Sequence, residues 1–357
     1  MMSADQQMLF VGSYAPADKA GIHIFDFDGS SGSLISRGSF AGVAKPSFLV
    51  VHPNGRWFYA VSETGLESDG RLGAVYAFHI DRNPLKIQSI NQQSTDGDWP
   101  CHLIIDGSGR WLLAANYGTG SVAVYPIQPD GQVGEKTAFV EHQGRGPNEE
   151  RQERAHAHST ILAPDNRFVF VVDLGIDQLV TYQFDVASGQ LSPHAIAEAH
   201  PGAGPRHGAF HPDGRRLYLA NELDNTVTVY DYDGQQGQLH ALQTLDTLPP
   251  GAPENTVADI HVSASGSRVY VSNRGHNSVA VFAVGENGSL KNLGFPSCGG
   301  DWPRNFSLSP DGRYMLVANR FSNEISVLPV QVGEGELGEP LTQVSVSEPS
   351  CVQFLIG

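Results

Sequence analysis

The stretch PRHGAFHPDGRRLYLANE (205–222) decides the fold, because variants of it recur along the chain. It reads as an apolar strand, a turn with Pro, Asp and Gly, and a second apolar strand, which is typical of a β-hairpin. The other copies are PSFLVVHPNGRWFYAVSE (46–63), PCHLIIDGSGRWLLAANY (100–117), AHSTILAPDNRFVFVVDL (157–174), VADIHVSASGSRVYVSNR (257–274) and PRNFSLSPDGRYMLVANR (303–320). A repeat of roughly 50 residues indicates an array of similar structural units.

A third strand is expected after each hairpin, followed by a more variable fourth segment. The third strands fall at 72–80, 120–127, 177–185, 225–233, 277–284 and 323–330. Four strands per repeat describe the blade of a β-propeller better than a sandwich or a solenoid. No helical periodicity competes over a comparable length of sequence.

The two chain ends supply the remaining blade. The C-terminal PSCVQFLIG (349–357) resembles the first strand of the hairpin, and the N-terminal MLFVGSY (8–14) resembles the second. The sequence therefore predicts an all-β fold, a seven-bladed β-propeller with four-stranded blades, in which the N- and C-terminal strands close the last blade. Such closure removes free sheet edges. We expect residues 1–357 to form a single domain.

The charge balance narrows the classes of partner. The formal net charge of −16 argues against nucleic acid and against anionic membrane surfaces, which both need a basic footprint. The start, MMSADQQMLFVGSY, has no basic region followed by a long apolar one, so no signal peptide is expected. Three cysteines without a C-x-x-C spacing give neither a disulfide framework nor a zinc ligand set. We expect a cytoplasmic protein.

The hairpin repeat also predicts where polar chemistry collects. With the first residue of each copy as position zero, the turn is centred near positions eight and nine. Positions zero and one then lie beside positions sixteen and seventeen, at the end opposite the turn. In a propeller whose inner strands form this hairpin, these positions surround one mouth of the central channel. Position sixteen carries small polar residues, which we expect to cap the turn into the third strand.

Charged residues occupy the other positions at this end. They are His158, Arg206 and Arg304 at position one, His207 at position two, and Glu222, Arg274 and Arg320 at position seventeen. Several arginines brought together repel one another unless an anionic ligand or paired acids neutralise them. The pattern favours a ligand site, with salt-bridge packing as the alternative.

Four runs carry a family resemblance. GRGPNEERQERAHAHS (144–159), GAGPRHGAFHPDGRRLYLANEL (202–223), SNRGHNSV (272–279) and WPRNFSLSPDGRYMLVANR (302–320) resemble the bacterial lactonase family. That family includes cycloisomerase-2 type 6-phosphogluconolactonases and a fungal carboxymuconate cyclase. The resemblance covers essentially the whole chain. It implies a propeller with its site in the channel mouth, acting on a lactone without a metal or other cofactor, through His156 and His158, Arg206, Glu222 and Arg274.

The chemistry of lactone opening suggests a role for each residue. His158 suits the general base, because an unperturbed histidine has a pKa of about 6.5, and Glu222 is the orienter or alternative base. Arg206 suits stabilisation of the oxyanion. Arginines bind phosphate through paired charge-assisted hydrogen bonds. The expected substrate-binding or phosphate-binding residues are Arg274, Arg304, Arg320, His207 and Arg154, and His156 joins the catalytic set.

Other interpretations remain beside this one. His156 and His158 lie two residues apart on a predicted strand and so face one side, as a metal pair would. No cluster of acids accompanies them at ligand spacing, so no metal is expected. The expected function is 6-phosphogluconolactonase, with a small anionic lactone as substrate and a place in the pentose phosphate pathway. The alternatives are a lactone-forming carboxymuconate cycloisomerase and a non-catalytic propeller that binds partners.

Overall fold

The computed structural model describes residues 6–82, 84–331 and 336–355. In this part of the chain the structure has seven four-stranded sheets and one short helix, α1 (Leu66–Asp69). The chain divides into two compact units. The described residues of unit 1 are 6–42, 207–232, 240–331 and 336–355; those of unit 2 are 43–82, 84–206 and 233–239.

Six of the sheets follow the predicted order of hairpin, third strand and fourth strand. The first of these sheets contains β4 (Leu49–Val51), β5 (Trp57–Ser62), β6 (Ala74–Arg82) and β7 (Leu85–Ser94). The second contains β8 (Pro100–Ile105), β9 (Trp111–Asn116), β10 (Ser121–Pro126) and β11 (Ala138–Glu141). The third contains β12 (Ala157–Leu162), β13 (Phe168–Asp173), β14 (Gln178–Asp185) and β15 (Gln190–Glu198). The fourth contains β16 (Pro205–Phe210), β17 (Arg216–Asn221), β18 (Thr226–Asp233) and β19 (Gln238–Asp246). The fifth contains β20 (Thr256–Val262), β21 (Arg268–Arg274), β22 (Ser278–Val284) and β23 (Leu290–Gly294). The sixth contains β24 (Pro303–Leu308), β25 (Tyr314–Asn319), β26 (Glu324–Pro329) and β27 (Thr342–Ser345).

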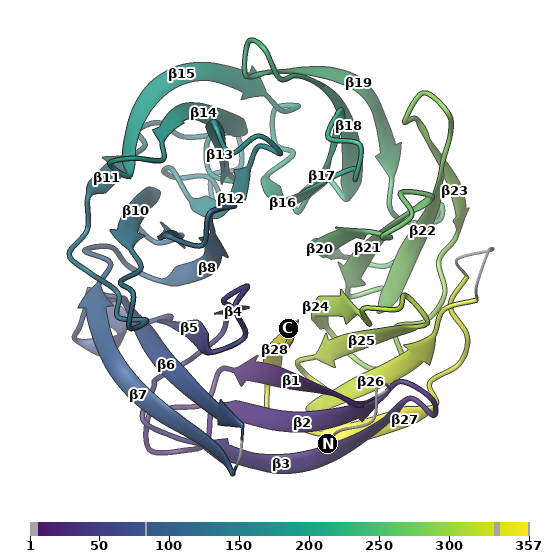
Figure 1. Ribbon diagram of the computed structural model, residues 1–357. Coiled ribbons are helices and arrows are strands. Elements are labelled where there is room, and N and C mark those ends of the chain that lie inside the picture. The colour runs from purple at the N-terminus through teal and green to yellow at the C-terminus, as the bar shows by residue number, and fades with distance from the viewer. Residues whose placement is uncertain (1–5, 83, 332–335, 356–357) are drawn as a thin grey trace. The chain divides into compact units, whose positions relative to one another are not determined.

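The seventh sheet is built from both ends of the chain. Its order is β28 (Pro349–Phe354), β1 (Gln6–Ser13), β2 (Ile22–Asp28) and β3 (Ser33–Phe40). Strand β1 pairs antiparallel with β28, with Leu9 opposite Phe354 and Gly12 opposite Cys351. Figure 1 shows the C-terminal β28 in yellow beside the N-terminal β1 in purple. The prediction of a last blade closed by the two termini is confirmed; residues 356–357 of the predicted strand lie outside the described residues.

The hairpins hold a feature that the sequence did not reveal. Position zero pairs with position sixteen, as Ala157 does with Asp173, but the next pair is Ser159 with Val172. The residue at position one, here His158, is therefore the extra residue of a β-bulge. The same shift occurs at Cys101 and at Arg304. A bulge bends its strand and re-aims the side chain, which is why bulges are frequent next to active sites.

The polar residues at position sixteen hold the next strand in place. Asn319 donates from Nδ2 to Ser326 Oγ at 3.0 Å, and Asn116 donates to Ser121 Oγ at 3.0 Å. The intervening turn ends in a left-handed residue, with φ +56° at Asn323 and +60° at Gly120. Asn and Gly reach this conformation at low cost. The predicted structural role is confirmed, although the partners include hydroxyls of the third strand and not the backbone alone.

The apolar core lies between neighbouring sheets. In unit 1 one cluster combines the last blade with the sheet of β24–β27; its members include Leu9, Phe27, Leu316, Val352 and Phe354. The rings of Phe27 and Phe354 meet edge to face at 5.6 Å. Full burial of such a side chain contributes about 1.5–3 kcal/mol. The blades are thus fixed by apolar contact, which leaves polar residues for the strand ends.

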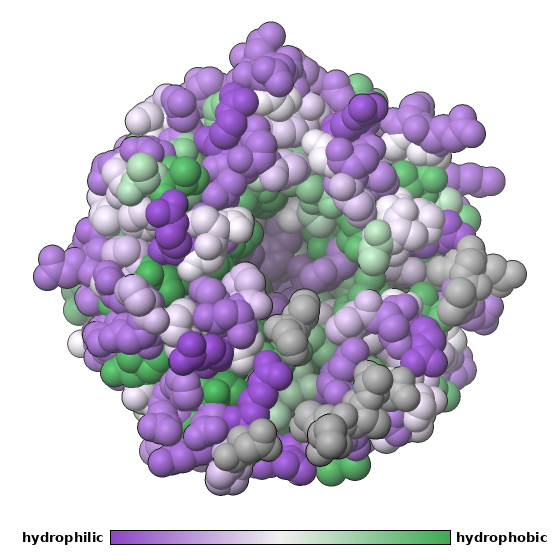
Figure 2. Space-filling view, viewed as in Figure 1, coloured by the Kyte–Doolittle hydropathy of each residue, from purple (hydrophilic) through white to green (hydrophobic). Residues whose placement is uncertain are grey.

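Figure 2 shows hydrophilic and intermediate residues over most of the visible face, with apolar residues scattered among them. Some apolar side chains are exposed, among them Ile35, Ile196 and Leu341, which is normal for a protein surface. In the described residues, no helix has the length and apolar character needed to cross a membrane.

Candidate functional site

The candidate residues fall into both units, and each unit is described by itself. Unit 2 contains Arg154, His156, His158 and Arg206. Unit 1 contains His207, Glu222, Arg274, Arg304 and Arg320. Most are buried although they are polar or charged, which requires compensation by hydrogen bonds or opposite charge.

His158 occupies the bulge of β12, and only 5% of it is exposed. Its ring meets that of Tyr117 edge to face, with centroids 5.5 Å apart. The Cys101 thiol donates to the carbonyl oxygen of His158 at 3.2 Å, and its sulfur lies 3.8 Å from Nδ1 of the ring. The aromatic ring and the thiol therefore fix the imidazole at a defined angle in a largely apolar setting.

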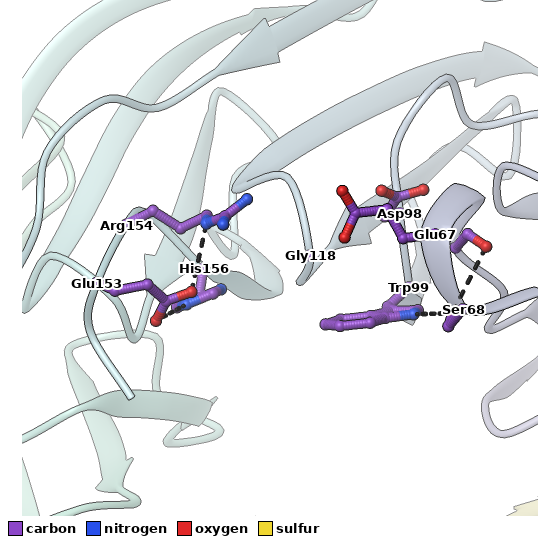
Figure 3. A pocket seen from close by; sticks show the side chains of 9 residues that line it. Glu67, Ser68, Asp98, Trp99, Gly118, Glu153, Arg154 and His156 are labelled. Carbon is purple, nitrogen blue, oxygen red and sulfur yellow. Dashed lines mark hydrogen bonds and ion pairs between the residues drawn. The ribbon is translucent and has the colours of Figure 1, made fainter. Parts of the chain in front are cut away.

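His156 is held more tightly. Its backbone N–H donates to Asp173 Oδ1 at 2.7 Å, and its ring stacks on Tyr117 at 4.3 Å. Nδ1 faces the carbonyl oxygen of Tyr117 at 2.9 Å, and Nε2 faces Glu153 Oε2 at 3.1 Å, as Figure 3 shows for the second contact. Both ring nitrogens face acceptor oxygens, so these two contacts fix the orientation of the His156 ring.

The two candidate arginines of unit 2, Arg154 and Arg206, differ in exposure. Arg206 is 2% exposed and is the largest fully buried side chain among the described residues. Its carbonyl oxygen accepts a hydrogen bond from Ser159 Oγ at 2.7 Å, which fixes the backbone of Arg206 beside β12. Arg154, with 65% of its side chain exposed, contacts Glu153 at 3.3 Å. Only Arg206 carries a permanent charge into a low-dielectric setting, where its electrostatic effect is largest.

In unit 1, Glu222 and Arg274 form a buried ion pair. Arg274 Nη2 lies 3.1 Å from Glu222 Oε2, and the two side chains are 5% and 4% exposed. The same Nη2 donates to the carbonyl oxygen of Val257 at 2.7 Å. The guanidinium carbon lies 5.5 Å from the centroid of the Trp302 ring, a cation–π distance. Thus an acid neutralises Arg274, as the salt-bridge alternative requires for this residue.

His207 belongs to a buried carboxylate cluster. Its Nδ1 lies 2.8 Å from Asp259 Oδ1, while His261 Nε2 lies 3.0 Å from Oδ2 of the same carboxylate and Asn305 Nδ2 donates to that Oδ2 at 2.6 Å. Burial alone would raise the pKa of Asp259, but the charge of His261 and the histidine hydrogen bonds hold it well below its usual range. Burial would lower the pKa of His261, yet Asp259 raises it overall.

His261 was not among the residues predicted from the sequence. It lies at position four of its copy, inside the apolar part of the first strand, where the repeat elsewhere places Val, Ile, Ala or Ser. A histidine two residues after Asp259 on a strand was the available signal, because residues two apart share a face. His207 was predicted from the sequence as a substrate contact and His261 was not, and both contact the Asp259 carboxylate.

Arg304 and Arg320 share an aromatic side chain. Their guanidinium carbons lie 5.2 Å and 4.1 Å from the centroid of the Tyr14 ring. Arg320 also forms an ion pair with Glu348, with Nη2 2.9 Å from Oε1. Both arginines are partly exposed, so they keep contact with solvent while the ring fixes their planes. Paired guanidinium groups on one aromatic ring present donors that suit an oxyanion.

No group of three or more His, Cys, Asp or Glu residues arranged to hold a metal ion was found within residues 6–82, 84–331 and 336–355. His156 and His158, the pair that shared a face in the predicted strand, have different hydrogen-bonding partners, although both rings pack against Tyr117. His156 contacts Glu153 and Tyr117, whereas His158 contacts Cys101.

Comparison with known proteins places the chain in a family. The family model described as "Lactonase, 7-bladed beta-propeller" matches residues 8–354. Relatives named 6-phosphogluconolactonase from Bacillus subtilis (strain 168) and Formosa agariphila are each 34% identical, over 348 and 353 residues. The alignments cover 97% of this chain in both cases, and 97% and 99% of the two relatives.

A solved structure agrees with this match. The periplasmic gluconolactonase of Pseudomonas aeruginosa is 33% identical and superposes with a TM-score of 0.91, covering 98% of this chain and 99% of that one. The seven four-stranded sheets, the sheet closed by β28 and the family match agree on the fold class. The resemblance seen in the sequence is confirmed: the chain belongs to the lactonase family of seven-bladed β-propellers.

Proposed function

We propose that this protein hydrolyses a sugar lactone, and that 6-phosphoglucono-1,5-lactone is its substrate. The observation that carries the proposal is the match over nearly the whole chain to relatives named 6-phosphogluconolactonase. The product would be 6-phosphogluconate, which assigns the protein to the pentose phosphate pathway. The buried histidine and arginine of unit 2 are the groups that such a reaction requires.

The reaction begins when water attacks the lactone carbonyl. In the proposal, His158 accepts a proton from this water as the C–O bond forms, since its ring is fixed by Tyr117 and Cys101. The carbonyl oxygen becomes negatively charged, and the buried Arg206 stabilises it. When the intermediate collapses, the ring C–O bond breaks and His158 returns the proton to the leaving oxygen, which gives the hydroxy acid.

His156 supports this step without exchanging the proton. Its stacking on Tyr117 orders the ring against which His158 also packs. Its bond to Glu153 ties this arrangement to the loop that carries Arg154. We assign Arg154, the most exposed of these groups, to capture of the anionic substrate from solvent.

The residues of unit 1 are assigned from their own contacts. Arg304 and Arg320 on Tyr14 are the proposed phosphate binders, because both are partly exposed and cationic. Glu222 orients Arg274 through their ion pair, and we assign Arg274 to substrate binding as a buried cation. His207, held by Asp259, is the remaining proposed substrate contact in this unit.

The decisive experiment is an assay of the purified protein with freshly prepared 6-phosphogluconolactone, with spontaneous hydrolysis as the background. Catalysis well above the background supports the proposal. Hydrolysis at the background rate contradicts it and favours a propeller that binds partners. An assay for lactone formation from a carboxymuconate tests the cycloisomerase alternative in the same preparation.

A cytoplasmic location stays a prediction from the sequence. One related structure is described as periplasmic, so the compartment does not follow from the family. Fractionation of the native host with an antibody against the chain would locate it. Enrichment of the protein in fractions with periplasmic markers would contradict the predicted location and would leave the proposed reaction unaffected.

A further inference from the structure

A pocket in unit 2 lies beside His156 and Arg154, and its other wall contains side chains that have no role in the proposed chemistry. Its volume is about 150 Å³. Figure 3 shows Glu153, Arg154 and His156 on one side and Glu67, Asp98 and Trp99 on the other. Gly65, Ser68 and Gly118 complete the wall. The pocket thus combines an aromatic ring with three carboxylates and a guanidinium group.

The Trp99 ring is held in a fixed position although 39% of the residue is exposed. Its Nε1 donates to Ser68 Oγ at 3.0 Å, and its backbone N–H donates to the carbonyl oxygen of Thr64 at 2.9 Å. A singly exposed apolar side chain is common on protein surfaces, but these two hydrogen bonds also hold the Trp99 ring and its backbone in place. A ring that is both exposed and held in place can bind a ligand against its face.

The repeat shows how unusual Trp99 is. The residue before position zero has a positive φ in several copies, with +48° at Lys45, +54° at Trp99, +65° at Trp302 and +42° at Glu348. The left-handed backbone is therefore a property of the repeat. Lys45 is paired with Asp69, and Glu348 with Arg320.

Trp302 is the close counterpart, since Asp, Trp and Pro follow one another at both places. Its ring is covered by Phe321, stacked at 4.6 Å, and by Arg274 at 5.5 Å. No ring or cation of the described residues covers Trp99 in this way. The same backbone position thus holds a covered tryptophan in one copy and an open one in another.

Two glycines leave room around the open ring. A Cβ at Gly65 would lie 2.6 Å from Trp99 Nε1, and a Cβ at Gly118 would lie 2.8 Å from Asp98 Cβ and 3.1 Å from the Trp99 ring. Contacts this short force the neighbour to move. Any side chain at either place would displace the ring or the carboxylate and close the pocket.

The carboxylates supply acceptors beside the ring. Asp98 Oδ1 accepts the backbone N–H of Leu66 at 2.8 Å, which fixes the carboxylate and leaves Oδ2 for a ligand. Glu67 is exposed and has no hydrogen bond to another described residue. The C–H groups of a sugar are attracted to the negative face of an aromatic ring, while its hydroxyls donate to carboxylates.

We propose that the Trp99 pocket binds the hydroxylated carbon chain of a sugar, with Trp99 under its C–H face and Glu67 and Asp98 accepting from its hydroxyls. The proposal rests on the proposed sugar lactone function and names the part of the substrate held here. Phosphate is disfavoured in this pocket, because Glu67, Asp98 and Glu153 repel it. Arg154 is paired with Glu153. Glu67 and Asp98 would therefore also attract an organic cation, and such a cation is an outcome that the experiments below must separate from a sugar.

The first experiment compares two lactones in steady-state kinetics. Glucono-1,5-lactone carries hydroxyls, and δ-valerolactone has the same ring without them. We expect Trp99→Ala to raise KM for the hydroxylated lactone by roughly tenfold, the size of one aromatic contact, and to leave δ-valerolactone unchanged. Glu67→Gln, a change on an exposed side chain, should act in the same direction. Phe139→Ala removes an aromatic ring of similar exposure (38%) and is the matched control.

The outcomes distinguish a wrong pocket assignment from a wrong proposed function. Equal losses on both lactones in Trp99→Ala, or no loss on either, would overturn the pocket assignment. The second experiment is ligand-observed NMR of the full chain with D-glucitol, a neutral polyol that does not react. Binding by the wild type that is lost in Trp99→Ala and kept in Phe139→Ala supports the pocket even when neither lactone is hydrolysed, in which case the proposed function fails alone. Binding of choline in place of D-glucitol would overturn the sugar assignment.

Discussion

The guanidinium of Arg274 lies 3.1 Å from the carboxylate of Glu222, and both side chains are almost completely buried. The two residues come from neighbouring copies of the repeat, each at position seventeen. An ion pair removed from water in this way is costly to break, because the remaining charge has no solvent to stabilise it.

Glu222→Gln should lower the free energy of unfolding by about 3–5 kcal/mol, since it leaves the Arg274 charge buried and uncompensated. Urea denaturation monitored by circular dichroism measures the change. The matched control is Glu348→Gln at the more exposed Arg320 pair, where the side chains are 28% and 44% exposed and the expected cost is about 0–1 kcal/mol. Equal effects at the two pairs would contradict the importance of burial.

Asp259→Asn should destabilise the protein by about 3 kcal/mol near pH 6, because two histidines and Asn305 lose their common acceptor. The Asp259 pKa is lowered, so its contribution is present above its ordinary value of 3.8 and is lost as the pH falls through the folded-state pKa. The His261 pKa is raised, so its contribution is full below 6.5 and is lost as the pH rises through the raised pKa.

The difference in unfolding free energy between wild type and Asp259→Asn is therefore expected to be largest between pH 3.8, above which Asp259 contributes fully, and pH 6.5, below which His261 contributes fully. It is expected to be smaller at pH 9. Denaturation series at pH 5, 7 and 9 measure it. A difference that grows steadily toward pH 9 would show that the His261 charge contributes nothing to the cluster.

His158→Gln should lower kcat for 6-phosphogluconolactone by about 10²–10⁴-fold, the range for loss of a general base, with little change in thermal stability. Spectrophotometric assay above the spontaneous background measures it. His194→Gln, on an exposed strand position of the same unit, is the control and should keep wild-type kcat. A His158→Gln variant with near-normal kcat would remove this residue from the proposed mechanism.

Phe354→Ala should cost about 3–5 kcal/mol of unfolding free energy, because the ring is 5% exposed and packs against Phe27 in the last blade. Thermal unfolding followed by calorimetry reports the loss. Gln353→Ala, at the adjacent position of the same strand, should change stability by no more than about 0.5 kcal/mol. Similar effects of the two substitutions would argue against the core contact of β28.

The fold was predictable because the same hairpin pattern recurs along the chain. Seven copies of one hairpin agree with one another, so an error in a single strand does not change the count of blades. The split copy at 349–357 and 8–14 was recognisable because each half matches one strand of the template. The turns at Asn323 and Gly120 also follow from residue type, since these residues tolerate the left-handed conformation.

The candidate site was predictable only in part. The register located His158 at the end of its hairpin, but the bulge that re-aims it depends on one unpaired residue and leaves no mark in the sequence. The Glu222–Arg274 pair joins residues from different copies, and a pairing over that distance is set by packing rather than by local pattern. Trp99 and Trp302 share one motif, and only their neighbours make one ring covered and the other open.

The pairing of β1 with β28 also sets an order of events during synthesis. Strand β1 is synthesised before its inner partner β28, and the strands of the six other blades lie between them in the sequence. Until β28 has been made, the backbone groups of β1 and its buried residues Leu9 and Val11 lack the partners that β28 supplies. The last blade therefore closes only after β28 has been made, and a chain truncated before β28 presents an open strand edge by which cellular quality control can distinguish it.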